Sequence, residues 1–180
     1  VSVKDFGANG GGVTDDTVAF IAGNTAAAGG TLFAPTGTYN ISSITIGQNN
    51  SFNTNTSFYG DGPGTVIVPS TDNTVVLTAS AGSGWRQPQF FSNFVIKNSY
   101  SKTNITALAL DGRSHVAGLR IEDVEVLDAD VCAFDLSYCQ FGRFYNLVAH
   151  GGFALPYTSV GFRLQPQTAG GGSNSNDFYA

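Results

Sequence analysis

More than half of the acidic residues, the side chains best suited to acid–base chemistry, fall between residues 111 and 135. Hydrolysis of a glycosidic bond needs two carboxyl groups held about 5–10 Å apart across that bond. Cleavage by elimination needs instead a base such as Lys, Arg or His, and a cation or Arg that neutralises a carboxylate of the substrate. From this stretch and the arginines that follow it, we select these catalytic candidates: Glu122, Asp123, Asp135 and Arg163.

The same charged residues also have a structural interpretation. If neighbouring strands stack about 4.8 Å apart, Asp135 beside Arg163 and Lys97 beside Glu122 would form ion pairs between strands. His115 and His150 have no Ser or Cys partner in a recognisable motif, so a catalytic triad is not supported. Ion pairing and catalysis therefore remain two alternatives for this stretch.

Aromatic residues give a separate indication of contact with carbohydrate. Trp85 with Arg86, and Phe153 with Tyr157, lie in segments between expected strands, and Tyr145 lies on a strand. Amphipathic rings present an apolar face to a ligand, while neighbouring polar groups bond its hydroxyls. The expected glycan-binding residues are Trp85, Arg86, Tyr145 and Tyr157. The alternative is that such side chains cover the flank of a helix or join a subunit interface.

The composition argues for a turn-rich β protein with few surface charges. Charged residues make up 12% of the 180 residues, against roughly 25% in typical domains. The net charge of −5 disfavours binding to nucleic acid. No stretch approaches the about 20 apolar residues that span a bilayer, so membrane insertion is not expected. Cys132 and Cys139 fit no zinc or disulfide pattern, so we expect free thiols, no metal and no cofactor.

Two families of short β-type segments repeat with one period near 25 residues. Members of the first family each end in Asn or Asp: Phe94–Asn98, Leu119–Asp123 and Gly142–Asn146. Members of the second family lie between them: Ala107–Leu110, Ala133–Leu136 and Gly161–Leu164. Interleaved families with a common period indicate a solenoid whose coils stack strand on strand. The sequence thus predicts an all-β, right-handed, single-stranded parallel β-helix with an N-terminal capping α-helix; a β-sandwich matching by chance is the alternative.

Alternation of side chains then assigns the faces of these strands. The expected inward stacks are Ile96–Ile121–Phe144, Leu108–Phe134–Phe162 and Leu110–Leu136–Leu164. The expected outward ladders are Lys97–Glu122–Tyr145, Val95–Arg120–Arg143 and Ala109–Asp135–Arg163. Asx residues tolerate left-handed backbone geometry, which predicts a bend at Asn98, Asp123 and Asn146.

One helix is expected, at Asp15–Ala28, with Thr14 as its N-cap and a glycine pair at its end. A solenoid exposes apolar core at its ends, so this helix would serve as a lid, and Asp15 and Asp16 would have structural roles. We expect residues 1–40 to form the cap and residues 41–180 to form the first coils. The last strand, near the C-terminus, has no cap after it, which predicts that the solenoid is truncated there.

The N-terminal third resembles the pectate-lyase-like β-helix superfamily, which includes phage tailspikes, polysaccharide depolymerases and epimerase modules. The resemblance rests on Val3–Ala8 (VKDFGA), Gly10–Thr17 (GGGVTDDT), Gly29–Tyr39 (GGTLFAPTGTY) and Phe58–Ile67 (FYGDGPGTVI). Gly11 stands where the family usually has Asp, in a loop position. The resemblance implies the β-helix fold, and it implies that catalytic residues often lie on later coils.

The resemblance and the residues together favour a phage-type tailspike or tail fibre segment, in a virion tail, that binds polysaccharide of the host surface as a homotrimer. Depolymerase activity, as a glycosidase or lyase, would belong to the full chain. The alternatives are a secreted, extracellular, monomeric polysaccharide lyase or hydrolase, and a structural adhesin or virion module without catalysis. The oligomeric state separates the first two, and turnover of polysaccharide separates both from the third.

Overall fold

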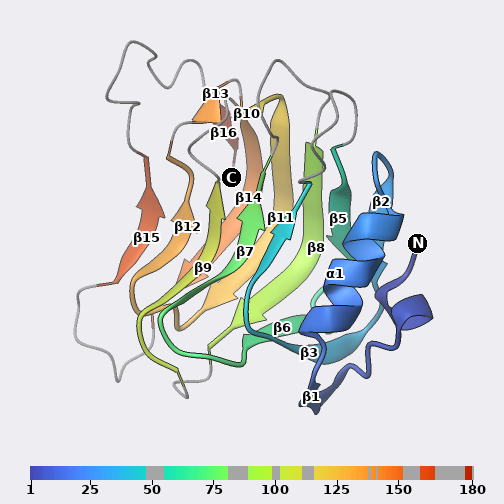
Figure 1. The fold of residues 1–180 in the computed structure, drawn as a ribbon. Coiled ribbons are helices and arrows are strands. Elements are labelled where there is room, and N and C mark those ends of the chain that lie inside the picture. The colour runs from blue at the N-terminus through green and yellow to red at the C-terminus, as the bar shows by residue number, and fades with distance from the viewer. Residues whose placement is uncertain are drawn as a thin grey trace.

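Parallel β-strands make up nearly all of the regular structure (Figure 1). The computed structural model describes residues 1–47, 55–80, 89–98, 102–110, 116–137, 139–140, 142–151, 159–164 and 177–179. Every pairing between named strands in these ranges is parallel.

The strands form three sheets. The nine-stranded sheet contains β1 (Gly11–Asp15), β2 (Thr31–Ala34), β3 (Gly37–Ile41), β5 (Ser57–Gly60), β6 (Thr65–Pro69), β8 (Gln89–Lys97), β11 (Leu119–Leu127), β14 (Arg143–His150) and β16 (Asp177–Tyr179). The five-stranded sheet contains β4 (Ile44–Ile46), β7 (Thr74–Ala79), β9 (Ile105–Leu110), β12 (Cys132–Asp135) and β15 (Val160–Arg163). A small third sheet pairs β10 (Val116–Ala117) with β13 (Cys139–Gln140).

Successive coils of the chain pass through both large sheets. In the larger sheet β8 is followed by β11 and β14, while β9 and β12, which lie between them in sequence, are neighbours in the other sheet. Strands of equivalent position in consecutive coils therefore pair with each other, as a parallel β-helix requires. The predicted fold class is confirmed.

Single residues bend the three long strands of the larger sheet. Asn93 in β8, Asp123 in β11 and Asn146 in β14 have φ angles of 61°, 53° and 45°. This left-handed region is one that Asn and Asp adopt more readily than other non-glycine residues. In the preceding coil the bend is longer: β5 and β6 are separate strands joined by residues 61–64, and they pair with the two halves of β8.

The predicted bend and stack were right for β11 and β14 but wrong for β8. Ile121 lies opposite Phe144 as expected, but its partner in β8 is Phe91. Ile96 lies opposite Val126 instead, and Asn98 bonds the backbone of Leu127 and Asp128 rather than stacking on Asp123. Val95 and Lys97 were expected opposite Arg120 and Glu122. This is also wrong, because Val95 pairs with Glu125 and Lys97 pairs with Leu127. Each long strand carries apolar residues on both sides of its bend. The pattern of apolar residues used to align the strands therefore fits the half-strand before the bend as well as the half-strand after it.

The second predicted stack is confirmed in its register. Phe134 is fully buried and lies between Leu108 and Phe162, with its ring 5.0 Å from that of Phe162 and nearly parallel to it. Phe162 and Leu164 were expected to point into the core, but they are 42% and 49% exposed. No described strand follows β15 in its sheet, so nothing described covers these two side chains.

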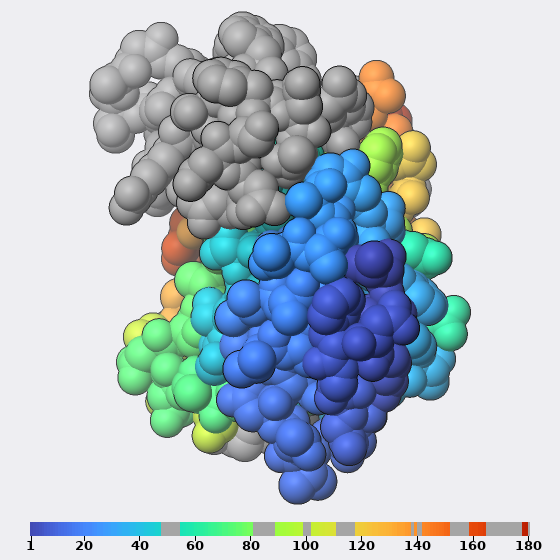
Figure 2. All heavy atoms as spheres, turned by 45° about the vertical axis from the view of Figure 1, so that its right-hand side comes forward, coloured from blue at the N-terminus to red at the C-terminus, as the bar shows by residue number. Residues whose placement is uncertain are grey.

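Helix α1 (Thr17–Ala26) and the short 3₁₀ helix η1 (Val3–Phe6) cover one end of the solenoid, seen face on in Figure 2. Phe20 of α1 is fully buried, with its ring 5.3 Å from that of Tyr39 and 6.1 Å from that of Phe58. The expected lid is therefore present.

The helix begins later than expected, because Thr14 and Asp15 belong to β1. Asp16 is the N-cap residue, and its buried carboxylate accepts hydrogen bonds from the backbone N–H groups of Asn9 and Gly10. The carboxylate of Asp15 accepts one from Thr17 N–H. Both aspartates thus hold the lid and its loop in place, as expected from their position.

Candidate functional site

The outer face of the larger sheet, on the N-terminal side of the bends, carries aromatic and charged side chains on successive coils. Glu122 lies opposite Ser92 of the preceding coil and Tyr145 of the following coil, and Tyr145 lies opposite Tyr179. The pairing of β5 with β8 places Tyr59 next to Ser92 in the same ladder. The ladder therefore runs along the solenoid axis from β5 to β16.

Arg120 and Glu122 form the charged part of this face. Nε of Arg120 donates to Oε2 of Glu122 at 2.8 Å, and Nη2 donates to the same oxygen. The expected partner of Glu122 was Lys97, and that expectation is wrong because Lys97 lies on the other side of its bend. The guanidinium carbon of Arg120 also lies 5.0 Å from the ring centroid of Tyr145, a distance typical of a cation–π contact.

The ring of Tyr145 is covered on both faces. Arg120 comes from the preceding coil, and Tyr179 of the following coil stacks on the ring at 4.5 Å with an angle of 5°. A sugar ring therefore has no free face of Tyr145 to stack on. The hydroxyl of Tyr145 remains for hydrogen bonding.

Two exposed rings nearby were not expected from the sequence. Phe90 is 42% exposed and lies opposite Arg120, and Tyr59 is 41% exposed with its ring 4.8 Å from that of Phe33. Only the true register of β8 shows that Phe90 points outward beside Arg120, so no signal within a single segment could identify it. The outer ladder surface, as we define it, consists of Tyr59, Phe90, Arg120, Glu122, Tyr145 and Tyr179.

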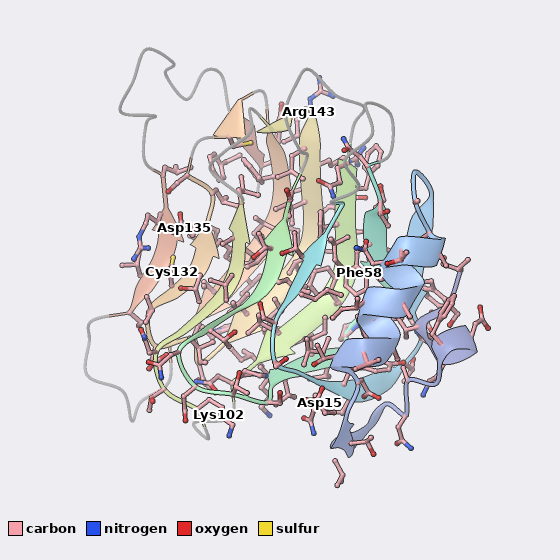
Figure 3. The ribbon with its side chains drawn as sticks, viewed as in Figure 1. Asp15, Phe58, Lys102, Cys132, Asp135 and Arg143 are labelled. Atoms are coloured by element: carbon pink, nitrogen blue, oxygen red, sulfur yellow. The ribbon has the colours of Figure 1, made fainter. Side chains whose placement is uncertain are left out.

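Asp135 and Arg163 lie on the other large sheet, away from this surface. Nη1 of Arg163 donates to Oδ2 of Asp135 at 2.9 Å, and the other carboxylate oxygen accepts from the hydroxyl and backbone N–H of Ser137. Figure 3 shows Asp135 beside β12 and β15, and Arg143 near the top of the view, where β14 begins. The predicted ion pair is confirmed, and the four catalytic candidates do not converge on one site.

Asp123, although adjacent to Glu122 in sequence, belongs to a groove at the bends. Its Oδ1 accepts a hydrogen bond from Nδ2 of Asn146 at 2.8 Å. Glu125 lies on the same groove and approaches Nε2 of His150 at 3.2 Å. The groove has a volume of about 340 Å³, and it is lined by Gly62, Pro63, Asn93, Phe94, Val95, Asp123, Val124, Glu125, Asn146 and Val148.

The remaining candidate residues from the sequence add little to the site. Trp85, Arg86 and Tyr157 lie outside the described residues, as does His115. Both cysteines are buried and neither is part of a disulfide; burial raises the pKa of Cys132 and raises that of Cys139 to about 12. Within the described ranges, no three His, Cys, Asp or Glu side chains are grouped to hold a metal, and no helix is long and apolar enough to cross a membrane.

Known structures share the fold of this chain. The A-module of mannuronan C-5 epimerase AlgE4 from Azotobacter vinelandii superposes with a TM-score of 0.68 at 22% identity, over 91% of this chain and 53% of that one. The A-module of AlgE6 from the same organism gives 0.63 at 22% identity, over 99% and 56%. The ORF18 protein of Geobacillus virus E2 gives 0.52 at 20% identity, over 88% and 39%. The chain thus spans about half the length of the two epimerase modules.

No curated protein matches the sequence closely. A protein family does: residues 1–141 match the family described as rhamnogalacturonase A/epimerase, pectate lyase-like. This match includes the cap, the bend at Asp123 and most of the outer ladder surface. The chain belongs to this pectate-lyase-like family of rhamnogalacturonases and epimerases.

Proposed function

We propose that this chain is a segment of a phage-type tailspike or tail fibre, and that it binds polysaccharide of the host surface. The observation that carries the proposal is the outer ladder surface, which runs along the solenoid over successive coils. A linear polysaccharide is an extended ligand with repeating hydroxyls, and such a ladder offers it repeating contacts. The family match supports carbohydrate as the ligand class.

Each part of the outer ladder surface has a distinct contact to make. The exposed ring of Phe90 offers an apolar face for a sugar ring. The hydroxyls of Tyr145 and Tyr179 can donate to and accept from sugar hydroxyls, and the carboxylate of Glu122 accepts from them. Because Arg120 already bonds Glu122 and packs on Tyr145, these groups are held in position before a ligand arrives.

A homotrimer is part of this proposal. None of the residues between Asp16 and Asp61 is charged, so the N-terminal coils can be buried against another copy without leaving ions unpaired. Closed cyclic symmetry lets each chain offer one surface to the next. The ORF18 protein of a Geobacillus virus, which has the same fold, is consistent with a place in a virion.

A second candidate is a secreted, monomeric enzyme that modifies polysaccharide. The family name and the two epimerase modules of similar fold favour it. Against it, the described catalytic candidates are split between two sheets, and Asp135 is held by Arg163 and Ser137. The third alternative, a structural module, would bind no polysaccharide.

Two measurements on the full chain separate these functions. Light scattering at micromolar concentration should give three times the chain mass for the tailspike segment and a single chain mass for the secreted enzyme. Affinity electrophoresis through gels containing purified bacterial surface polysaccharides, followed by an assay for new reducing ends or unsaturated products, tests binding and turnover. A trimer that binds polysaccharide, with or without product, supports the proposal; a monomer, or a chain that no polysaccharide retards, contradicts it.

A further inference from the structure

The groove at the bends arises where the bend of the larger sheet changes in length. Between β5 and β6 the bend takes the four residues 61–64, whereas in each following coil one residue suffices. The longer turn packs against the first short bend, since Gly62 N–H donates to the carbonyl of Asn93 at 3.0 Å. A step results, with exposed Pro63 on one side and Asn93, Asp123 and Asn146 in succession on the other.

The lining of this groove combines apolar and polar groups. Pro63, Val95 and Val148 supply apolar surface. The polar groups are two side-chain amides, of Asn93 and Asn146, and two carboxylates, of Asp123 and Glu125. Its volume of about 340 Å³ lies within the range of roughly 300–1,000 Å³ for pockets that hold small ligands.

The hydrogen bonds within the groove leave capacity for a ligand. One carboxylate oxygen of Asp123 accepts from Asn146 Nδ2, so the second oxygen and the second amide hydrogen of Asn146 remain for other partners. The carboxylate can accept from one hydroxyl of a sugar ring, while the N–H of the neighbouring amide donates to the next hydroxyl. The apolar groups opposite match the C–H surface of that ring.

We infer that this groove is a second carbohydrate site, which binds one ring of a neutral sugar through adjacent hydroxyls. The ligand class follows from charge. Asp123 and Glu125 make the groove anionic, His150 is the one described cation-forming side chain that contacts either of them, and a uronate carboxylate would be repelled. The outer ladder surface carries Arg120 instead, and Arg143 lies opposite Arg120 in the next coil. This inference relies on the proposed function only for carbohydrate as ligand, not for the surface that binds it.

Nuclear magnetic resonance on the uniformly ¹⁵N-labelled full chain tests the groove directly. The probes are the methyl glycosides of glucose, mannose and galactose, with glucuronic acid as the charged comparison. The side-chain amide signals of Asn93 and Asn146 should shift with at least one neutral glycoside and not with glucuronic acid. The side-chain amides of Asn24 and Asn40, which bond Thr45 and Gly12 far from the groove, should stay unchanged.

Variants that remove charge but keep shape identify the residues responsible. Asp123→Asn suits the left-handed backbone at this position and keeps an oxygen that accepts from Asn146. It should weaken binding of the responding glycoside by about tenfold, because a charge-assisted hydrogen bond becomes a neutral one. Glu125→Gln serves as a second variant in case the first fails to fold. Asp15→Asn, an exposed carboxylate at the cap, is the matched control and should bind normally.

The outcomes distinguish this inference from the proposed function. Loss of glycoside binding in Asp123→Asn or Glu125→Gln, with Asp15→Asn unaffected, supports the groove even if no polysaccharide binds the outer ladder surface. Absence of any shift at Asn93 and Asn146 with the three neutral glycosides overturns it. An equal response to glucuronic acid, or unchanged affinity in both groove variants, overturns it as well.

Discussion

Tyr39 shows how one buried side chain links the stability of the cap to pH. Its ring is fully buried against Phe20, and its hydroxyl donates to the carbonyl of Pro35 at 2.8 Å. Burial, with a smaller contribution from the negative charge of Asp16, raises the pKa of Tyr39 from 10.0 to about 12. The folded protein therefore holds this proton at a pH where the unfolded chain has released it.

We predict that this difference lowers the free energy of unfolding as pH rises. The contribution is fully present below pH 10 and is lost between pH 10 and 12, by about 2–3 kcal/mol. Denaturant melts at pH 9, 10, 11 and 12 measure it. Tyr39→Phe should lose less stability over this range than the wild type; equal pH dependence in the two proteins would contradict the assignment to Tyr39.

Phe134 tests the packing of the inner stack. Its fully buried ring lies between Leu108 and Phe162 in consecutive coils. Phe134→Ala should cost about 3–5 kcal/mol, because it removes buried apolar surface and leaves a cavity. Val18→Ala on the exposed side of α1 is the control and should change stability little. A loss below about 1 kcal/mol in denaturant melts would be too small for a core site.

At the scale of the strand, the single-residue bends are the decisive elements. Left-handed backbone geometry costs a residue other than Asn, Asp or Gly about 1–2 kcal/mol of stability. Asn93 has φ of 61°, so Asn93→Ala should destabilise by about that amount, whereas Asn93→Gly should destabilise less. Thermal melts of the two variants compare them directly. Equal destabilisation would mean that the side chain of Asn93, and not its backbone, matters at the bend.

The strands could be predicted from sequence better than their register. Ala107–Leu110 and Ala133–Leu136 were predicted as stacked strands, and β9 and β12 pair them in the predicted register, with Leu108 opposite Phe134. Phe94–Asn98 was aligned with Leu119–Asp123, but its true partner is the half-strand after the bend, Val124–Leu127. Two equally apolar half-strands flank each bend, and local pattern alone cannot choose between them.

At the scale of the molecule, the repeat was enough to predict the fold but not the site. A repeated strand–bend pattern has few ways to bury its apolar residues, and stacking the coils is the way that these parallel sheets adopt. The outer ladder surface depends on which residues of distant coils face each other. Phe90 joins Arg120 only in the true register, so the sequence predicted Glu122 and Tyr145 there but missed their neighbours.

The most direct test of this account is the effect of the outer ladder surface on polysaccharide binding. Affinity electrophoresis of the full chain through gels containing purified bacterial capsular and cell-wall polysaccharides measures it. At least one polysaccharide should retard the wild type, and Phe90→Ala should weaken that binding by about tenfold. Tyr145→Phe, which keeps the stack and removes the hydroxyl, should weaken it less, and Val18→Ala should bind as the wild type does. If no polysaccharide retards the wild type, or if Phe90→Ala binds equally well, the outer ladder surface is not the binding site.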